Sequence, residues 1–261
     1  LFLPEKDLET YIESIGASFS WLEKEPAPKA ANHSAPFEEK TFKQVKPLLP
    51  IQTEPRYIES FSSLTKEEVV DSSKYTPMEI PLGTLPPGKK TGLLLHTLIE
   101  QMIKLGFYQN CKSSASQEWI HSFVKNTENA PFENEIFSMV EKVFSAPLLP
   151  KALHSIPLDN LEVEFAFTFQ EKGIMMTGFI DLVVIHEGKV FIIDWKSNYL
   201  PSYTHQNLLE EVAKHQYDLQ ARIYRAALLQ SLRRKNLDLK FGGTYYVFLR
   251  ALVEGQGILS L

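Results

Sequence analysis

Residues 177–198 read TGFIDLVVIHEGKVFIIDWKSN, and this stretch decides the fold. Two runs rich in β-branched and aromatic residues flank Glu187-Gly188, a glycine-containing break of two residues that is typical of a tight β-hairpin. A loop at these two residues pairs His186 with Lys189 and thereby sets the register of both strands. The neighbouring positions are apolar on both faces, which indicates a central strand pair covered by helices.

This register brings two carboxylates together. Counted back from the turn, Asp181 lies opposite Asp194, and strand alternation puts Lys196 on the same face while Ile193 and Trp195 point away. Like charges directly opposite each other in a sheet cost about 0.2–1 kcal/mol even when exposed, and burial makes unpaired charge costlier. A divalent cation between the carboxylates would turn repulsion into ligation. The alternative, a structural ion pair of Lys196 with Asp194, leaves Asp181 unexplained.

The composition limits the class of protein. With 261 residues, 44% of them hydrophobic, the chain can bury the core of one large domain or two small ones. The net charge of −5 argues against a polybasic DNA-binding protein, so any DNA contact would be local. The single cysteine excludes an internal disulfide and fits a reducing compartment. No apolar stretch approaches the roughly 20 residues of a membrane span, and we expect a soluble, cytoplasmic protein.

The chain before the hairpin domain divides into two parts. Apolar residues at helical spacing over 8–22 predict a helix, so residues 1–22 are interpreted as the end of a preceding domain. Residues 23–56, rich in Lys, Glu and Pro, are typical of a linker. The chain opens on leucine without the features of a signal peptide, and we interpret it as a piece of a longer protein. We expect one domain over residues 57–261.

Within that domain the periodicity predicts helices and strands around the hairpin. The predicted elements are a helix over 93–105 ended by Gly106, helices over 119–124 and 131–144, a strand over 161–169, a helix over 207–232 and a strand over 243–250. Residues 83–91 have part of the spacing of a phosphate-binding loop. However, Lys90 stands in place of the required Ser or Thr and two prolines remove backbone donors, so we exclude a nucleotide site there.

Several polar side chains outside the hairpin are ambiguous by pattern alone. His96 lies at the edge of an apolar helical stripe, where a structural histidine is the commoner case, and His121 and His154 lack partners at ligand spacing. Glu162 and Glu164 share one face of the predicted strand, and either is compatible with solvent exposure. Three further residues share one helix face, which by spacing alone favours packing against a sheet. These are Tyr217, Gln220 and Tyr224.

Two short motifs carry a resemblance to a known family. Gly178-Phe179-Ile180-Asp181 and Asp194-Trp195-Lys196-Ser197-Asn198 resemble the signature of the RecB-type nucleases, within the PD-(D/E)XK phosphodiesterase superfamily. Residues 92–100, 217–224 and 241–250 resemble further blocks of the same family, while Trp195 departs from its common tyrosine on the side away from the carboxylates. The resemblance implies an α/β fold with a restriction-endonuclease-like core, a central mixed β-sheet flanked by α-helices.

The resemblance also implies roles for individual residues. The implied metal ligands are His96, Asp181 and Asp194. The implied catalytic residues are Asp181, Asp194, Lys196 and Glu162, the last chosen over Glu164. The implied substrate-binding residues are Gln220, Tyr224 and Tyr217. Mg²⁺ is the implied cofactor, with Mn²⁺ or Ca²⁺ as alternative occupants.

The implied activity is that of a Mg²⁺-dependent exodeoxyribonuclease of the exodeoxyribonuclease V type. It implies the nuclease domain of a RecBCD-type helicase–nuclease, which degrades DNA ends in recombinational double-strand break repair with RecC-like and RecD-like partners. The alternative is a catalytically weak or inactive nuclease fold that binds DNA or a partner subunit. Loss of Asp181, Asp194 or Lys196 would favour that alternative, and all three are present. A phosphoesterase for small substrates would need a closed pocket that the sequence does not identify.

Overall fold

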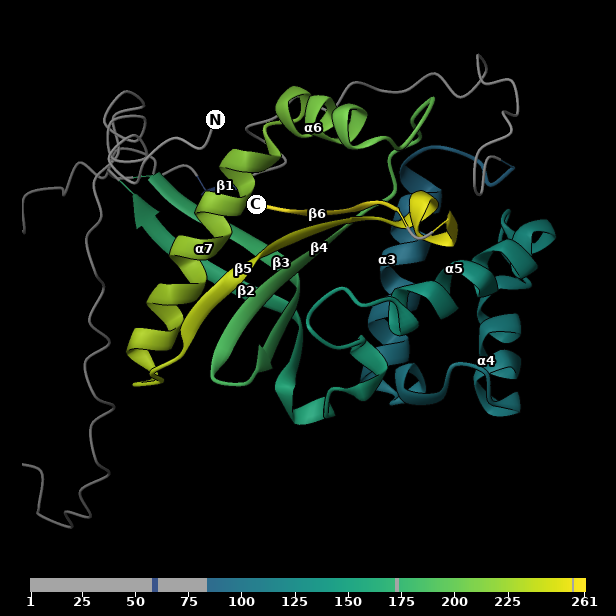
Figure 1. The fold of residues 1–261 in the computed structure, drawn as a ribbon, viewed down its shortest axis with the longest axis horizontal. Coiled ribbons are helices and arrows are strands. Elements are labelled where there is room, and N and C mark those ends of the chain that lie inside the picture. The colour runs from purple at the N-terminus through teal and green to yellow at the C-terminus, as the bar shows by residue number, and fades with distance from the viewer. Residues whose placement is uncertain (1–57, 61–83, 172–173, 255) are drawn as a thin grey trace, which may run out of the picture. The chain divides into compact units, whose positions relative to one another are not determined.

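The computed structural model describes residues 58–60, 84–171, 174–254 and 256–261 (Figure 1). The chain divides into two compact units, one of residues 1–59 with 169–176 and the other of residues 60–168 with 177–261. The described part of the first unit consists of most of β1 (Ile58–Ser60) and the ends of two longer strands. The predicted helix in residues 1–22 and the predicted linker over 23–56 lie outside the described residues.

The second unit is built on a mixed sheet. β2 (Leu161–Glu171) pairs with β3 (Ile174–His186), and β3 pairs with antiparallel β4 (Lys189–Lys196). β5 (Lys240–Phe248) runs parallel to β4, and β6 (Ile258–Ser260) is antiparallel to β5. A parallel neighbour needs a crossover connection, which the helices between β4 and β5 supply. The predicted mixed sheet flanked by helices is confirmed (Figure 1).

The hairpin turn forms where the sequence predicts it. Glu187 and Gly188 both have positive φ, 49° and 71°, as a type I′ turn requires. The strand pairs run from His186–Lys189 to Leu182–Ile193, as predicted. One position further along this register, Asp181 and Asp194 reach the same end of the hairpin.

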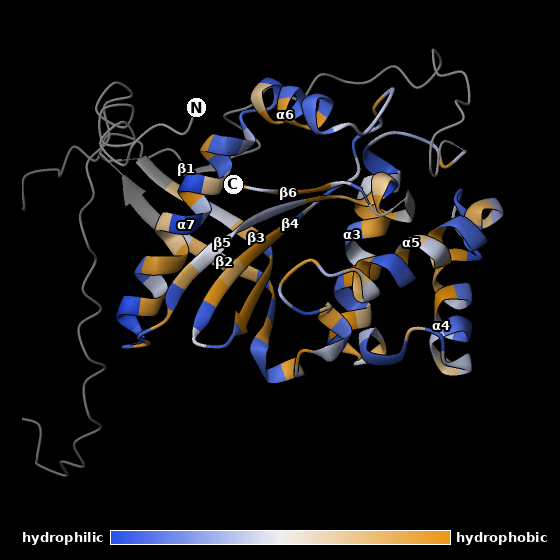
Figure 2. Cartoon of the chain, in the orientation of Figure 1, coloured by the Kyte–Doolittle hydropathy of each residue, from blue (hydrophilic) through white to orange (hydrophobic). Residues whose placement is uncertain are grey.

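Three helices lie on one side of the sheet, where the second in chain order packs on the other two. They are α3 (Lys89–Lys104), α4 (Ser114–Val124) and α5 (Glu133–Ser145). Their apolar side chains pack with Leu182, Phe191, Ile193 and Trp195 in one core, and Figure 2 shows the apolar strands of the hairpin beside these helices. α3 begins before the predicted residue 93, directly after Gly88, whose φ is 114°. The prediction missed this first turn because its residues are polar and do not extend the apolar stripe. It ends as predicted before Gly106, whose φ is 77°.

Two helices cover the other face, where the sequence predicts one helix over 207–232. That prediction is wrong, because α6 (His205–Lys214) and α7 (Tyr217–Arg234) are separated at Gln216, whose φ of 54° is left-handed. Gln216 is neither Gly nor Pro, so the composition carries no breaker signal there. A second core packs these helices against β5 and β6, with Leu208, Val212, Ala221, Tyr246, Phe248 and Leu259 among its members.

The strand β5 begins before the predicted residue 243 and stops before residue 250. Its register against β4 shifts between Val190 and Phe191, so that Gly242 is the extra residue of a bulge. Only glycine fits this position, because a Cβ there would lie 2.2 Å from Phe191 Cε1. After Phe248 the chain turns into the 3-10 helix η6 (Leu249–Glu254). The bulge matters for the site because it sets Tyr246 beside Asp194.

Candidate active site

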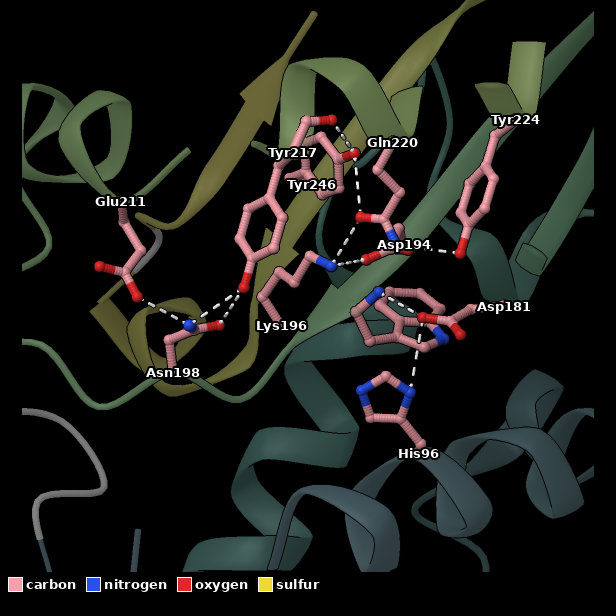
Figure 3. Close-up of polar contacts among 11 residues, drawn as sticks. His96, Asp181, Asp194, Lys196, Asn198, Glu211, Tyr217, Gln220, Tyr224 and Tyr246 are labelled. Carbon is pink, nitrogen blue, oxygen red and sulfur yellow. Dashed lines mark hydrogen bonds and ion pairs between the residues drawn. The ribbon is translucent and has the colours of Figure 1, made fainter. Parts of the chain in front are cut away.

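The end of β4 carries a buried ion pair. Asp194 is 3% exposed, and Lys196 Nζ lies 2.6 Å from Asp194 Oδ2. Burial raises the pKa of Asp194 to about 6, with a further raising contribution from Asp181 and an opposing one from Lys196. Burial acts to lower the pKa of Lys196, but Asp194 outweighs it and the pKa is raised. The alternation predicted from the sequence therefore brings these two side chains together (Figure 3).

Asp181 and His96 form a second pair at the same end of the hairpin. His96, on α3, places Nδ1 3.5 Å from Asp181 Oδ2, and the same oxygen accepts a hydrogen bond from the Trp195 backbone N–H at 2.8 Å. Burial acts to raise the pKa of Asp181, but His96 and the Trp195 N–H lower it below its ordinary value. Burial acts to lower the pKa of His96, while Asp181 and Asp194 raise it overall.

The ammonium group of Lys196 is held on several sides. Besides Asp194, it donates to Gln220 Oε1 at 3.0 Å, and it lies 3.8 Å from the centre of the Tyr217 ring. Both residues come from the first turn of α7, so the sharp break at Gln216 is what directs them at β4. The three groups match the three N–H donors of a lysine.

The hydrogen bonds along α7 have a fixed direction. Lys196 can only donate, so Gln220 must present its oxygen to Lys196 and its amide N–H₂ to Tyr224. Gln220 Nε2 donates to Tyr224 Oη at 2.9 Å. The face of Tyr217, Gln220 and Tyr224 is therefore turned towards the site rather than only packed on the sheet (Figure 3).

The structure separates the two glutamates of β2. Glu162 is exposed, whereas Glu164 is half-buried with a left-handed φ of 53° that interrupts the strand alternation. Burial raises the pKa of Glu164, and Asp181 and Glu100 raise it further. The arrangement thus favours Glu164, the alternative to the predicted Glu162, as the carboxylate directed at the site.

The chemistry of these side chains fits a divalent cation. Asp194 is buried, and the partly buried Asp181 lies at the same end of the hairpin. Among the described residues, Asp194 Oδ2 finds no partner with hydrogen-bond geometry, although Lys196 lies close. Oxygen ligands with an imidazole nearby suit Mg²⁺ or Mn²⁺. As they stand, no three His, Cys, Asp or Glu side chains in the described part of the chain lie close enough to enclose a metal. Lys196 and His96 lie against the two carboxylates instead.

Two polar features of the site were not predicted from the sequence. Tyr246, on β5, is fully buried and contacts both Tyr217 and Gln220. Asn198 Nδ2 donates to Glu211 Oε1 at 2.7 Å and to the Tyr217 hydroxyl at 3.1 Å. The bulge in β5 brings Tyr246 to the site, and the α6–α7 break brings Glu211 and Tyr217 to Asn198, the last residue of the Asp194–Asn198 motif.

Two histidines outside the site, His121 and His154, take part in structural contacts. His121 pairs with Glu133 at 2.9 Å, and His154 Nδ1 lies 2.9 Å from the Phe144 carbonyl oxygen. No helix in the described ranges combines the length and apolarity needed to cross a membrane.

The fold and the site together define a nuclease-type α/β domain, in which a hairpin presents Asp181 beside an Asp-x-Lys sequence. Comparison with known proteins agrees, because residues 79–259 match the PD-(D/E)XK nuclease superfamily. The chain belongs to this superfamily.

Three of the similar proteins are RecB subunits of the RecBCD enzyme. The chain is 31% identical over 224 residues to the RecBCD enzyme subunit RecB of Chlamydia pneumoniae, covering 80% of this chain and 21% of that protein. It is 30% identical over 223 residues to RecB of Escherichia coli (strain K12), covering 70% and 18%, respectively. For RecB of Chlamydia muridarum the identity is 30% over 267 residues, covering 97% and 24%. The chain thus spans about a fifth of the length of these relatives, as the shares of 21% and 18% show.

Proposed function

We propose that this chain is the nuclease domain of a RecBCD-type helicase–nuclease and cleaves DNA as a Mg²⁺-dependent exodeoxyribonuclease in recombinational double-strand break repair. One observation supports the proposal most. Asp194 and Lys196 form a buried pair at the end of β4, with Asp181 and His96 beside them, in a chain of the PD-(D/E)XK nuclease superfamily.

Each side chain has a part in the proposed reaction. Asp181, Asp194 and His96 would hold the cation, which when bound supplies an activated water and charge neutralisation at the phosphoryl group. Once Asp194 holds the cation, the Lys196 N–H that now faces this carboxylate would donate to the phosphoryl oxygens as negative charge develops on them. Tyr224, whose oxygen accepts from Gln220, keeps its own hydroxyl proton for a further acceptor, and a phosphate oxygen of DNA would serve. Tyr217 would act by supporting Lys196.

The charge of the chain bears on how DNA reaches this site. A net charge of −5 gives little general attraction for a polyanion. We propose that helicase regions of the full-length protein deliver the DNA end, together with RecC-like and RecD-like subunits. The relatives, named as subunits of the RecBCD enzyme, support this assembly.

The test is cleavage of linear DNA by the full-length protein with its partner subunits and Mg²⁺. Asp194→Asn and Lys196→Ala should each lower the cleavage rate at least about 100-fold, since each removes a group acting in the transition state. Asp218→Asn and Lys90→Ala are matched controls on exposed side chains, and each should cleave at the wild-type rate. Cleavage that survives both site substitutions, or that persists with a chelator, would contradict the proposal.

Metal binding can be measured without activity. Mg²⁺, Mn²⁺ or Ca²⁺ should raise the melting temperature of the wild-type protein, because a ligand that binds only the folded state stabilises it. Asp194→Asn should abolish this rise, and Asp218→Asn should retain it. Equal shifts in all three proteins would place the bound metal elsewhere.

A further inference from the structure

We propose that Tyr246 is a positioning residue for Lys196, resting on the proposed function in which Lys196 acts on the scissile phosphate. Tyr246 is on β5, in the strand register position beside Asp194. It is fully buried, and its ring and hydroxyl both contact the groups that hold the Lys196 ammonium (Figure 3).

The first connection runs through the hydroxyl group. Tyr246 Oη lies 2.5 Å from the Tyr217 backbone oxygen and 3.2 Å from Gln220 Oε1, and its single proton is directed at these two acceptors. The Tyr217 carbonyl belongs to the first turn of α7, so this bond ties the start of the helix to β5. Gln220 Oε1 is the same atom that accepts from Lys196 at 3.0 Å. The hydroxyl thus holds both the helix turn and the acceptor that receive the lysine.

The second connection runs through the rings. Tyr246 stacks on Tyr217 with ring centres 5.3 Å apart and an angle of 28° between the planes. Lys196 Nζ lies 3.8 Å from the Tyr217 ring centre and 5.1 Å from that of Tyr246. Tyr246 therefore backs the ring on which the ammonium rests, and it adds a weaker attraction of its own.

A lysine side chain needs such support, because four rotatable bonds leave its ammonium otherwise free to move. Asp194 alone, at 2.6 Å, attracts the ammonium without fixing its direction. Gln220 and Tyr217 fix it from α7, and Tyr246 fixes both of them from β5. Through these two hydrogen bonds and the ring stack, Tyr246 holds Gln220 and Tyr217, which contact Lys196 from α7, in a fixed position relative to β5.

The test compares Tyr246→Phe with Tyr108→Phe in the full-length protein with its partner subunits. Tyr108 is a matched control because it is also fully buried and its hydroxyl donates to one backbone oxygen, that of Ile156, at 2.7 Å. Each change removes one buried hydroxyl and keeps the ring, and both variants should lose similar amounts of melting temperature. Tyr246→Phe should lower kcat for DNA cleavage about 10- to 100-fold with KM little changed, the size expected for a misplaced catalytic group. Tyr108→Phe should leave kcat unchanged.

Two further measurements separate this inference from the proposed function. Lys196→Ala tests the function, and the crystal structure of Tyr246→Phe tests the position of Lys196 independently of cleavage. Movement of Lys196 Nζ away from Gln220 Oε1 in Tyr246→Phe, but not in Tyr108→Phe, would support the positioning role even if the protein does not cleave DNA. An unmoved Lys196, or equal kcat in both phenylalanine variants of a cleaving protein, would overturn it.

Discussion

Glu164 shows how a single residue can decide which side chain joins a site. In a regular strand, Glu162 and Glu164 would lie on one face and be equivalent. The left-handed φ of 53° at Glu164 ends this equivalence, and it leaves Glu164 half-buried near Asp181 while Glu162 is exposed. A non-glycine residue holding such a conformation inside a strand is strained, which points to a functional reason for it.

We expect Glu164→Gln to lower DNA cleavage by about tenfold or more, because it removes a charge from the group of site carboxylates. Glu162→Gln serves as the matched control two residues away and should cleave at nearly the wild-type rate. Single-turnover cleavage by the two variants decides between the glutamates. A loss in Glu162→Gln alone would restore the choice made from the sequence.

At the scale of elements, the separation of α6 from α7 orients the site. A continuous helix over the predicted range would carry Tyr217 and Gln220 on a different course relative to β4. The break depends on Gln216, which takes the left-handed conformation directly after α6, a position where glycine is usual. Its backbone N–H bonds to the Ala213 carbonyl at 3.3 Å and closes the helix end.

We expect Gln216→Gly to stabilise the protein by about 0.5–1 kcal/mol, since glycine removes the left-handed penalty but loses more backbone entropy on folding. The free energy of unfolding in denaturant is the measurement. Glu210→Gly, at an exposed position inside α6, is the control and should destabilise by about 1 kcal/mol. Destabilisation by both glycines to the same extent would show that Gln216 stores no conformational strain.

At the scale of the whole molecule, Arg250 joins segments that are distant in the sequence. It is 1% exposed and donates to Ser197 O at 3.0 Å, to Leu85 O at 2.7 Å and to Pro86 O at 2.8 Å. Ser197 follows the end of β4 that carries Asp194 and Lys196, and residues 85 and 86 lead into α3, which carries His96. Arg250 therefore sets α3 against the hairpin and, through it, His96 against Asp181.

We expect Arg250→Met to destabilise the protein by at least about 3 kcal/mol, because three carbonyl oxygens, that of Leu85 fully buried, lose charged donors. The midpoint and slope of chemical unfolding would measure the loss. Lys90→Met is the control, because Lys90 forms an exposed pair with Glu128 and its loss should cost less than about 1 kcal/mol. A comparable cost at both positions would mean that the backbone contacts of Arg250 contribute little.

The sequence by itself determined the hairpin and what it carries. A Gly-containing break between two β-branched runs sets the turn, and period-two alternation then sets which side chains meet, so Asp194 and Lys196 could be paired before the fold was known. These are local relations within about 20 residues, and local geometry governs them. The resemblance to the family motifs added His96 to the predicted site residues, and the apolar stripe predicts the helix that carries it.

Tertiary structure alone decided the surroundings of the hairpin. The Phe191 ring packs where a Cβ at Gly242 would lie, and neither the break at Gln216 nor the left-handed φ of Glu164 has a composition signal. Tyr246 reaches Lys196 only because the bulge fixes the β4–β5 register and α7 starts where it does. Such contacts join residues far apart in the chain, and periodicity along the sequence carries no information about packing between distant segments.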